Sequence, residues 1–173
     1  VMVGGQGNDV YTVENSADLV VEAVGEGDDM IKSSLSFDLS SNGINVEQLI
    51  LTGSTAANAV GNASDNLLTG NAAINNLSGN DGNDRLYGMA GNDALERGNG
   101  HELLVGGAGN DTLTGGTGAD VFWFNTATNA TANVDTITDF VSGSDSLQFS
   151  LSVLAKLGAA GQFAAGDARF RAN

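Results

Sequence analysis

Hydrophobic residues recur every nine positions through the middle of the chain. Between Gly61 and Trp123, one large apolar residue stands at each step of the period: Leu68, Leu77, Leu86, Leu95, Leu104, Leu113 and Phe122. A carboxylate or amide residue stands two positions before each of them: Asn66, Asn75, Asp84, Asp93, Glu102, Asp111 and Asp120. A fixed period with one apolar and one polar position is typical of a solenoid, in which successive turns of the chain stack on each other.

Each repeat divides into a glycine-rich turn of six residues and a strand of three. The turn is clearest at 106–111 and 115–120, and 85–87 is a typical strand. Because side chains alternate along a strand, only the middle residue of the three points inward. Two repeats, or eighteen residues, would then complete one coil with a short strand on each side. The pattern therefore predicts an all-β solenoid whose strands stack in parallel.

Stacking coils of this length would place acidic residues beside one another. Asp93 would face Asp111 along one edge, and Glu102 would face both Asp84 and Asp120 along the other. Like charges at close range disfavour the fold unless a cation lies between them. Calcium accepts carboxylate and carbonyl oxygens in flexible geometries, whereas magnesium demands a stricter octahedron. We therefore expect several calcium ions, Ca²⁺, between the coils.

The composition also favours cations as partners. The 173 residues carry 21 acidic and 6 basic side chains, and the net charge of −15 argues against DNA, RNA or anionic lipid as a partner. No apolar run is long enough to span a membrane. The chain contains no cysteine, which excludes a disulfide framework and a thiolate zinc site. Coils of this kind then need another staple in place of disulfides.

Repeats 106–114 and 115–123 fit the pattern G-G-x-G-x-D-x-U-x and so resemble the RTX, or hemolysin-type calcium-binding, proteins. The resemblance is closest over 79–123 and extends less regularly to 1–31 and 61–78. It implies a parallel β-roll in which the second and fourth carbonyls and the Asp of one turn hold each ion. The first and third carbonyls and the Asp of the turn eighteen residues later would complete the site.

Carried over to this sequence, the resemblance implies three calcium sites. The first would contain Met89, Gly91, Asp93, Gly106, Ala108 and Asp111. The second would contain Asn80, Gly82, Asp84, Arg97, Asn99 and Glu102. The third would contain Gly98, Gly100, Glu102, Gly115, Thr117 and Asp120.

Two parts of the repeat block depart from the pattern. Arg97 stands where the pattern has glycine, and Glu102 stands where it has aspartate. In the earlier repeats, Asn66 and Asn75 take the place of the aspartate. A neutral amide is a weaker calcium ligand, so we expect these two side chains to hydrogen-bond along the stack without metal. Calcium should then concentrate in residues 79–123.

The N-terminal segment 1–60 resembles the same family in a degenerate form. Residues 4–11 are a good copy of the repeat, and 25–29 are a partial one. We expect Asp9 and Asp29 to share an ion, with Gly5, Gly7 and Gly27 nearby. Residues 33–39 and 46–51 alternate like strands and are predicted to form a strand pair, joined by a turn at 40–43, that continues the solenoid.

After the regular repeats of 61–123, we expect a C-terminal cap over 124–173. Residues 134–140, followed by Gly143, Asp145, Leu147 and Phe149, are similar to the segment that closes the last coil in RTX proteins. Such a cap protects the open end of a solenoid. Residues 151–157 have a helical pattern. Family members usually continue to a C-terminal secretion signal, and we expect this chain to be truncated before it.

The leading hypothesis for function is a module that folds on binding Ca²⁺ outside the cell. It would aid type I secretion from a bacterium and stabilise a larger secreted protein, whose upstream domain would precede it on the same polypeptide; we expect it to be monomeric. One alternative is an extracellular adhesin or carbohydrate-binding module, with Phe122, Trp123 and Phe124 as a sugar platform. Another is an accessory C-terminal module of a secreted hydrolase, lyase or epimerase.

The sequence offers little for catalysis within these residues, and we expect no enzymatic activity there. His101 is the single histidine, so the usual zinc-protease motif is missing, and no G-x-S-x-G motif is present. Asp135 and Asp139, four residues apart, are compatible with a carboxylate pair for glycoside hydrolysis. We expect them instead to bind the backbone of the cap or a further ion.

Overall fold

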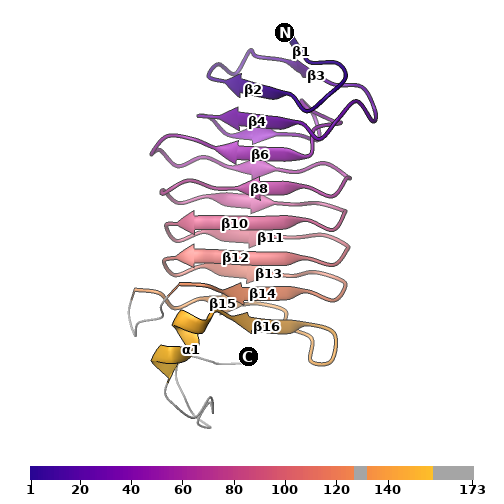
Figure 1. The fold of residues 1–173 in the computed structure, drawn as a ribbon. Helices are drawn as coiled ribbons and strands as arrows, with labels where there is room; N and C mark the ends of the chain where they lie inside the picture. The colour runs from indigo at the N-terminus through magenta and orange to yellow at the C-terminus, as the bar shows by residue number, and fades with distance from the viewer. Residues whose placement is uncertain (127–131, 158–173) are drawn as a thin grey trace.

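The protein is a stack of coils with a parallel sheet on each of two faces (Figure 1). The computed structural model describes residues 1–126 and 132–157. The eight-stranded sheet contains β2 (Val10–Val13), β4 (Met30–Ser33), β6 (Gln48–Leu51), β8 (Leu67–Thr69), β10 (Arg85–Ala90), β12 (Leu103–Ala108), β14 (Val121–Phe124) and β16 (Ser146–Phe149). The six-stranded sheet contains β5 (Phe37–Asp38), β7 (Ala59–Val60), β9 (Asn76–Ser78), β11 (Ala94–Glu96), β13 (Thr112–Thr114) and β15 (Thr136–Ile137). At the N-terminal end, β1 (Met2–Val3) pairs with β3 (Val20–Val21).

The predicted period sets the register of both sheets. Leu86 pairs with Leu68 and Leu104 in the larger sheet, and Leu95 pairs with Leu77 and Leu113 in the smaller one. Each of these leucines is at most 1% exposed, because the two ladders face each other across the interior of the coil. The predicted all-β parallel solenoid is therefore confirmed. The leucine ladders form the hydrophobic core of the regular repeats, and residues such as Val13 and Ile31 continue it into the N-terminal coils.

The turns between strands stack backbone on backbone, and this requires glycine at one position. Gly82, Gly91, Gly100, Gly109 and Gly118, the fourth residue of each repeat, all have φ between 120° and 151°. A Cβ added at Gly109 would collide with the carbonyl oxygen of Gly91 in the preceding coil. Glycine is the residue that combines this backbone conformation with such close approach.

The first N-terminal coils are wider than the regular ones, because Val10 pairs with Met30 and Phe37 pairs with Ala59. Their strands differ from the prediction. The predicted strand 33–39 is divided, because β4 ends at Ser33 and β5 contains only Phe37–Asp38. The Ser33 hydroxyl donates to the Leu35 carbonyl at 2.8 Å and accepts from the Leu35 amide at 3.1 Å, which turns the chain between the two strands. β5 and β6 then lie in different sheets and do not pair with each other.

The segment expected to form a cap adds one more coil to the stack. β15 pairs with β13 in the smaller sheet, and β16 pairs with β14 in the larger one. The predicted helix is present as α1 (Leu151–Leu157), below the last coil in Figure 1. Of the expected cap, residues 127–131 and 158–173 lie outside the described residues. Within the described part, no helix is long and apolar enough to cross a membrane.

Candidate metal centres between the coils

The acidic residue of each repeat is buried at the point where its turn enters a strand. Because residues two apart in an extended chain point to the same face, this carboxylate points inward like the leucine or phenylalanine that follows it. Each is at most 2% exposed: Asp84, Asp93, Glu102, Asp111 and Asp120. Buried carboxylates at such positions need hydrogen-bond donors or cations close to them.

The stacked coils supply a donor to one oxygen of each aspartate. The Oδ1 atom accepts a backbone N–H from the coil before it: Asn66 to Asp84 at 2.6 Å, Asn75 to Asp93 at 2.8 Å, Asp93 to Asp111 at 2.9 Å and Glu102 to Asp120 at 3.2 Å. The Oδ2 atom of every one of these aspartates is buried and accepts no hydrogen bond among the described residues. Such an atom is costly unless a cation approaches it.

The free oxygens face the first glycine of their own repeat. A Cβ added at Gly88 would lie 2.6 Å from Asp93 Oδ2, and one added at Gly106 would contact Asp111 Oδ2. The space that the Oδ2 atoms of Asp93 and Asp111 face is therefore bordered by the backbone of these glycines. Carboxylate and carbonyl oxygens without a competing donor are the ligands that calcium prefers. The residues present therefore fit a calcium ion.

Burial changes the protonation of these carboxyl groups. Burial, opposed by the Asn75 amide and assisted by the charge of Asp111, raises the pKa of Asp93 to about 7. Burial likewise raises the pKa of Asp120 to about 6, with the charge of Asp145 adding to the effect. Without metal, therefore, these sites take up protons close to neutral pH. Calcium has to displace those protons when it binds.

The edge that contains Asp84 and Glu102 holds a side chain that sequence reasoning did not place. The Arg97 guanidinium is fully buried, with Nη2 at 3.1 Å from Asp84 Oδ2 and 2.8 Å from Glu102 Oε1. The same atom donates to the Gly82 carbonyl at 3.0 Å. The prediction gave this site the Arg97 carbonyl and treated the Arg97 side chain as a bulky departure from the pattern, not as a cation for the carboxylates. Burial lowers the pKa of Arg97, whereas the charges of Asp84 and Asp120 raise it.

The asparagine side chains of the earlier repeats form hydrogen bonds, including one to the neighbouring coil, as predicted. Asn75 Oδ1 accepts the Asn71 amide at 2.8 Å, and Asn75 Nδ2 donates to the Ala57 carbonyl at 2.8 Å. Asn66 Oδ1 accepts the Asn62 amide at 2.7 Å. An amide carries its own donor, so the atom that replaces the free carboxylate oxygen finds an acceptor in the protein.

The residues predicted for the three repeat sites lie on neighbouring coils. Met89 pairs with Gly107 across the first site, Gly82 N donates to the Asn99 carbonyl across the second, and Gly100 N donates to the Thr117 carbonyl across the third. Five of the predicted carbonyl ligands already accept one backbone hydrogen bond: Asn80, Gly98, Asn99, Ala108 and Thr117. A carbonyl oxygen has two lone pairs, so this does not prevent coordination. The ligand sets themselves stay predictions.

At the N-terminal end, Asp9 and Asp29 lie on successive coils, and the Asp9 amide donates to Asp29 Oδ1 at 2.9 Å. Gly5 and Gly7 have positive φ, and Gly27 packs directly over the Gly7 carbonyl. The structure adds Glu22, whose carboxylate joins theirs. Sequence reasoning missed it because it stands outside the repeat pattern; its one signal is that it follows the buried Val20 by two residues.

The coil after the last repeat carries two further carboxylates in the same positions. Asp135 Oδ1 accepts the Asp111 amide, and Asp145 Oδ1 accepts the Asp120 amide, both at 3.1 Å. Asp145 was not predicted as a site residue, although Gly143-x-Asp145-x-Leu147 repeats part of the motif. Asp139 accepts the amides of Gly115 and Gly116 at 2.9 and 2.7 Å, so it binds backbone.

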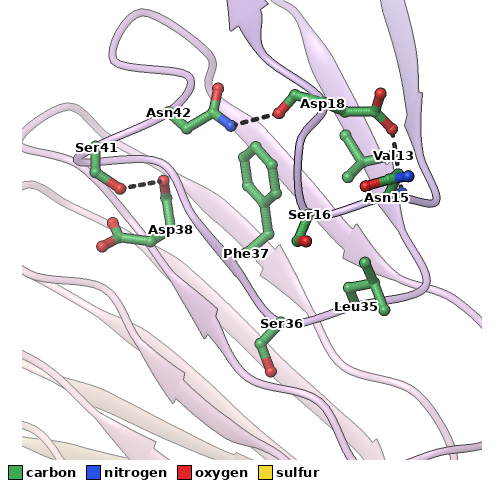
Figure 2. Close-up of a pocket in the computed structure, with 10 residues that line it drawn as sticks. All are labelled: Val13, Asn15, Ser16, Asp18, Leu35, Ser36, Phe37, Asp38, Ser41 and Asn42. Atoms are coloured by element: carbon green, nitrogen blue, oxygen red, sulfur yellow. Dashed lines mark hydrogen bonds between the residues drawn. The ribbon is translucent and has the colours of Figure 1, made fainter.

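A pocket near the N-terminal end offers little chemistry (Figure 2). It is lined by residues of the first wide coils, and the view shows Asp18 and Asp38 on different sides of the buried Phe37. Asp18 accepts the Asn15 amide at 3.1 Å, and Asp38 accepts the Ser40 amide at 2.8 Å. Both carboxylates therefore serve local turns. The buried carboxylates with free oxygens lie elsewhere.

The aromatic residues of the last repeat pack within the protein. Phe122 is fully buried in the core, and Phe124 stacks on Phe149 with ring centroids 5.3 Å apart. Trp123 is half-buried on the same strand. Packing of Phe122 and Phe124 therefore removes two of the three rings considered for a sugar platform.

Parallel coils with buried carboxylates in register define the class of β-solenoid repeat proteins. The family model for the RTX calcium-binding nonapeptide repeat, in four copies, matches residues 60–95 and 96–126. Residues 60–126 of this chain are therefore RTX calcium-binding repeats, and the resemblance is confirmed there. The chain is also 40% identical over 67 residues to the endo-1,3-1,4-beta-glycanase ExsH of Rhizobium meliloti (strain 1021). That stretch is 39% of this chain and 14% of the relative, so the chain spans a small part of the relative's length.

Proposed function

We propose that residues 79–123 fold on binding calcium outside the cell, and that the folded roll aids export of a larger secreted protein and stabilises it. The observation that carries this proposal is the row of buried aspartates, Asp93, Asp111 and Asp120, whose Oδ2 atoms accept no hydrogen bond among the described residues. Without a cation, these atoms oppose the packing that the leucine ladder favours. Calcium binding then contributes directly to the free energy of folding.

The coupling of folding to calcium binding would make folding depend on where free calcium is present. Calcium is scarce in the cytoplasm and abundant outside the cell, so the chain would stay unfolded until it had been exported. The matched relative is named as a glycanase, and the matching stretch is only 14% of its length. This supports an accessory role for the repeats here. We propose further that any enzymatic activity of the polypeptide that carries this module does not reside in the repeats.

The test compares the 173-residue chain in chelator and in millimolar calcium. We expect the β signal in circular dichroism to be weak in chelator and to rise in calcium, and hydrogen exchange to become slow at β10, β11, β12 and β13. Magnesium at the same concentration should have a much smaller effect, because it gives up its water ligands reluctantly. A chain that is equally folded in chelator and in calcium would contradict the proposal.

A variant pair locates the effect. Asp111→Asn removes a charge that Asp93 faces, and it should weaken the calcium response. Asp65→Asn makes the same chemical change at an exposed position in the repeat block and should behave like the unchanged chain. If both variants lost the response equally, net charge rather than the buried sites would be responsible.

A further inference from the structure

Three carboxylates meet at the N-terminal end, outside the residues that match the repeat family. Asp9 precedes β2, Glu22 follows β3 and Asp29 precedes β4. One oxygen of each lies within 4.8 Å of the others. Glu22 is 8% exposed and Asp29 is 1% exposed, so two of the three are more than nine-tenths buried.

Each of these carboxylates has one buried oxygen atom that accepts no hydrogen bond among the described residues. Asp29 Oδ1 accepts the Asp9 amide, and Glu22 Oε1 accepts the hydroxyl of Tyr11. Asp9 Oδ2, Glu22 Oε2 and Asp29 Oδ2 are buried without a hydrogen-bond partner among the described residues. Gly4 closes one side, since a Cβ there would collide with Asp9 Oδ2 and the Tyr11 hydroxyl.

The chemistry of this cluster requires a cation. Both ion pairs found among the described residues involve Arg97, so none involves these three carboxylates. Burial raises the pKa of Glu22, and the charges of Asp29 and Asp9 raise it further. Oxygen ligands without histidine or cysteine suit a hard cation rather than zinc. A formal charge of three carboxylates also favours calcium over a monovalent ion.

We propose that Asp9, Glu22 and Asp29 bind a calcium ion in a site of their own. Its third carboxylate comes from a position that no nonapeptide repeat supplies. The site joins three successive segments of the wide N-terminal coils, where the leucine period is interrupted. The ion would therefore stabilise the end of the stack that the regular repeats do not reach. This proposal does not depend on calcium binding in residues 79–123.

Terbium, a luminescent substitute for calcium, tests the site through Tyr11. Tyr11 is buried with its hydroxyl against Glu22, so its ring can sensitise an ion held there. Tyr87 and Trp123 lie in the repeat block and can sensitise ions bound there, so the signal of this site is the part of the terbium luminescence that Tyr11→Phe removes. We expect calcium to displace that part and Glu22→Gln to shift it to about tenfold weaker affinity or more. Glu14→Gln, an exposed change in the same segment, should leave the titration unchanged.

The outcomes separate this site from the repeats. Luminescence that Tyr11→Phe leaves undiminished, or a titration of the Tyr11-dependent part that Glu22→Gln leaves unchanged, would overturn the proposal. Asp29→Asn gives a second, independent loss of a ligand if Glu22→Gln alters the fold. Asp111→Asn should lower the number of calcium ions counted by native mass spectrometry and leave the Tyr11 signal in place. A failure in the repeats is thereby distinguished from a failure here.

A second inference rests on Arg97 and on the proposed calcium binding in the repeats. The Nη2 atom contacts Gly82 O, Asp84 Oδ2 and Glu102 Oε1, which are three of the six groups expected to hold an ion between these coils. Its Nε and Nη1 atoms have no hydrogen-bond partner among the described residues. Charge, rather than a full set of hydrogen bonds, therefore holds the guanidinium there.

We infer that the Arg97 guanidinium takes the place of calcium between Asp84 and Glu102. A guanidinium and a calcium ion would repel each other at that distance, so one excludes the other. The two departures from the repeat pattern then have one explanation. Arginine in place of the first glycine supplies the cation, and glutamate in place of aspartate has the length to reach it.

Ion counting by native mass spectrometry tests this exchange. Arg97→Gly restores the residue that the pattern has at this position, and we expect it to bind one calcium ion more than the unchanged chain. Arg97→Lys keeps a cation and should keep the count. In chelator, Arg97→Gly should melt at a lower temperature, because Asp84 loses its ion pair, and calcium should restore the loss.

Equal counts for the unchanged chain and Arg97→Gly, with calcium bound to both, would overturn the inference about Arg97 alone. If neither bound calcium, the proposed function would fail, and this inference with it. Asp93→Asn, on the other edge, is the control: it should lower the count in both backgrounds.

Discussion

Two neighbouring parts of the roll have the same backbone but different polar residues. The coils of residues 61–78 carry Asn66 and Asn75, and those of residues 79–123 carry aspartate or glutamate at the same positions. Both place a leucine two residues later in the same ladder. Asn75 is hydrogen-bonded through its oxygen and its nitrogen, whereas Asp93 has a free Oδ2 atom.

The comparison separates what forms the coil from what makes it depend on calcium. Leucine burial and backbone pairing between coils are common to both parts. The difference is one group of the side chain. Asparagine has an NH₂ group that donates a hydrogen bond, and aspartate has an oxygen that needs a cation. We therefore expect the asparagine coils to persist without calcium and the acidic coils to depend on it.

The largest expected effect is that of pH on the metal-free chain. The pKa of Asp93 is about 7 and that of Asp84 about 6 in the fold, against an ordinary value of 3.8. The folded chain thus holds protons that the unfolded chain releases, so this stabilisation is present in full below about pH 4 and is lost as pH rises through 6 and 7.

In chelator, the melting temperature should therefore fall between about pH 5 and about pH 8. In saturating calcium it should rise over the same range, because calcium binds the deprotonated carboxylates. Melting curves recorded at several pH values in both buffers check that the melting temperature changes with pH in opposite directions. Parallel curves in the two buffers would show that the buried aspartates do not control stability.

Converting acidic coils to the asparagine type should have the next largest effect. The double change Asp93→Asn with Asp111→Asn removes two buried charges and supplies two donors. We expect the free energy of unfolding in chelator to rise by about 2–5 kcal/mol, as neutral groups replace unpaired buried ones. Urea unfolding with and without calcium measures it. A double variant that is less stable in chelator would show that the amides find no acceptors here.

The reverse change, Asn75→Asp, should make an asparagine coil depend on calcium. It removes the bond from Nδ2 to the Ala57 carbonyl and places a carboxylate near Asp93. We expect a loss of about 1–3 kcal/mol in chelator. Asn76→Asp, at the exposed next position, is the matched control. Equal losses in the two variants would point to net charge instead of burial.

The smallest expected effect concerns the backbone of a single turn. Met89 has φ of 78°, in the left-handed region, at the second position of its repeat, where the corresponding Gly107 and Gly116 also have positive φ. Met89→Gly should relieve this strain and raise the free energy of unfolding in calcium by about 1 kcal/mol. Met30→Gly, at a strand position without positive φ, should lower it. A decrease for both would mean that the Met89 side chain contributes more than its backbone costs.

Much of the fold was predictable from the sequence, because a solenoid contacts itself at a fixed sequence separation. The nine-residue period gave the leucine ladder, the parallel register of Leu86 with Leu104, and the acidic positions beside it. The strands 33–39 and 46–51 were predicted less well, because that segment lacks the period. A local hydrogen bond at Ser33 ended the first strand early.

The sequence by itself determined the coil: which residues point inward, where glycine is required and which turns are acidic. These properties follow from local alternation and from a constant period. Only the tertiary structure decided which further side chains join the predicted pairs of charges. Glu22 beside Asp9 and Asp29, and the Arg97 guanidinium between Asp84 and Glu102, depend on how neighbouring coils are aligned and on how far a flexible side chain reaches. The sequence of a single repeat predicts neither contact.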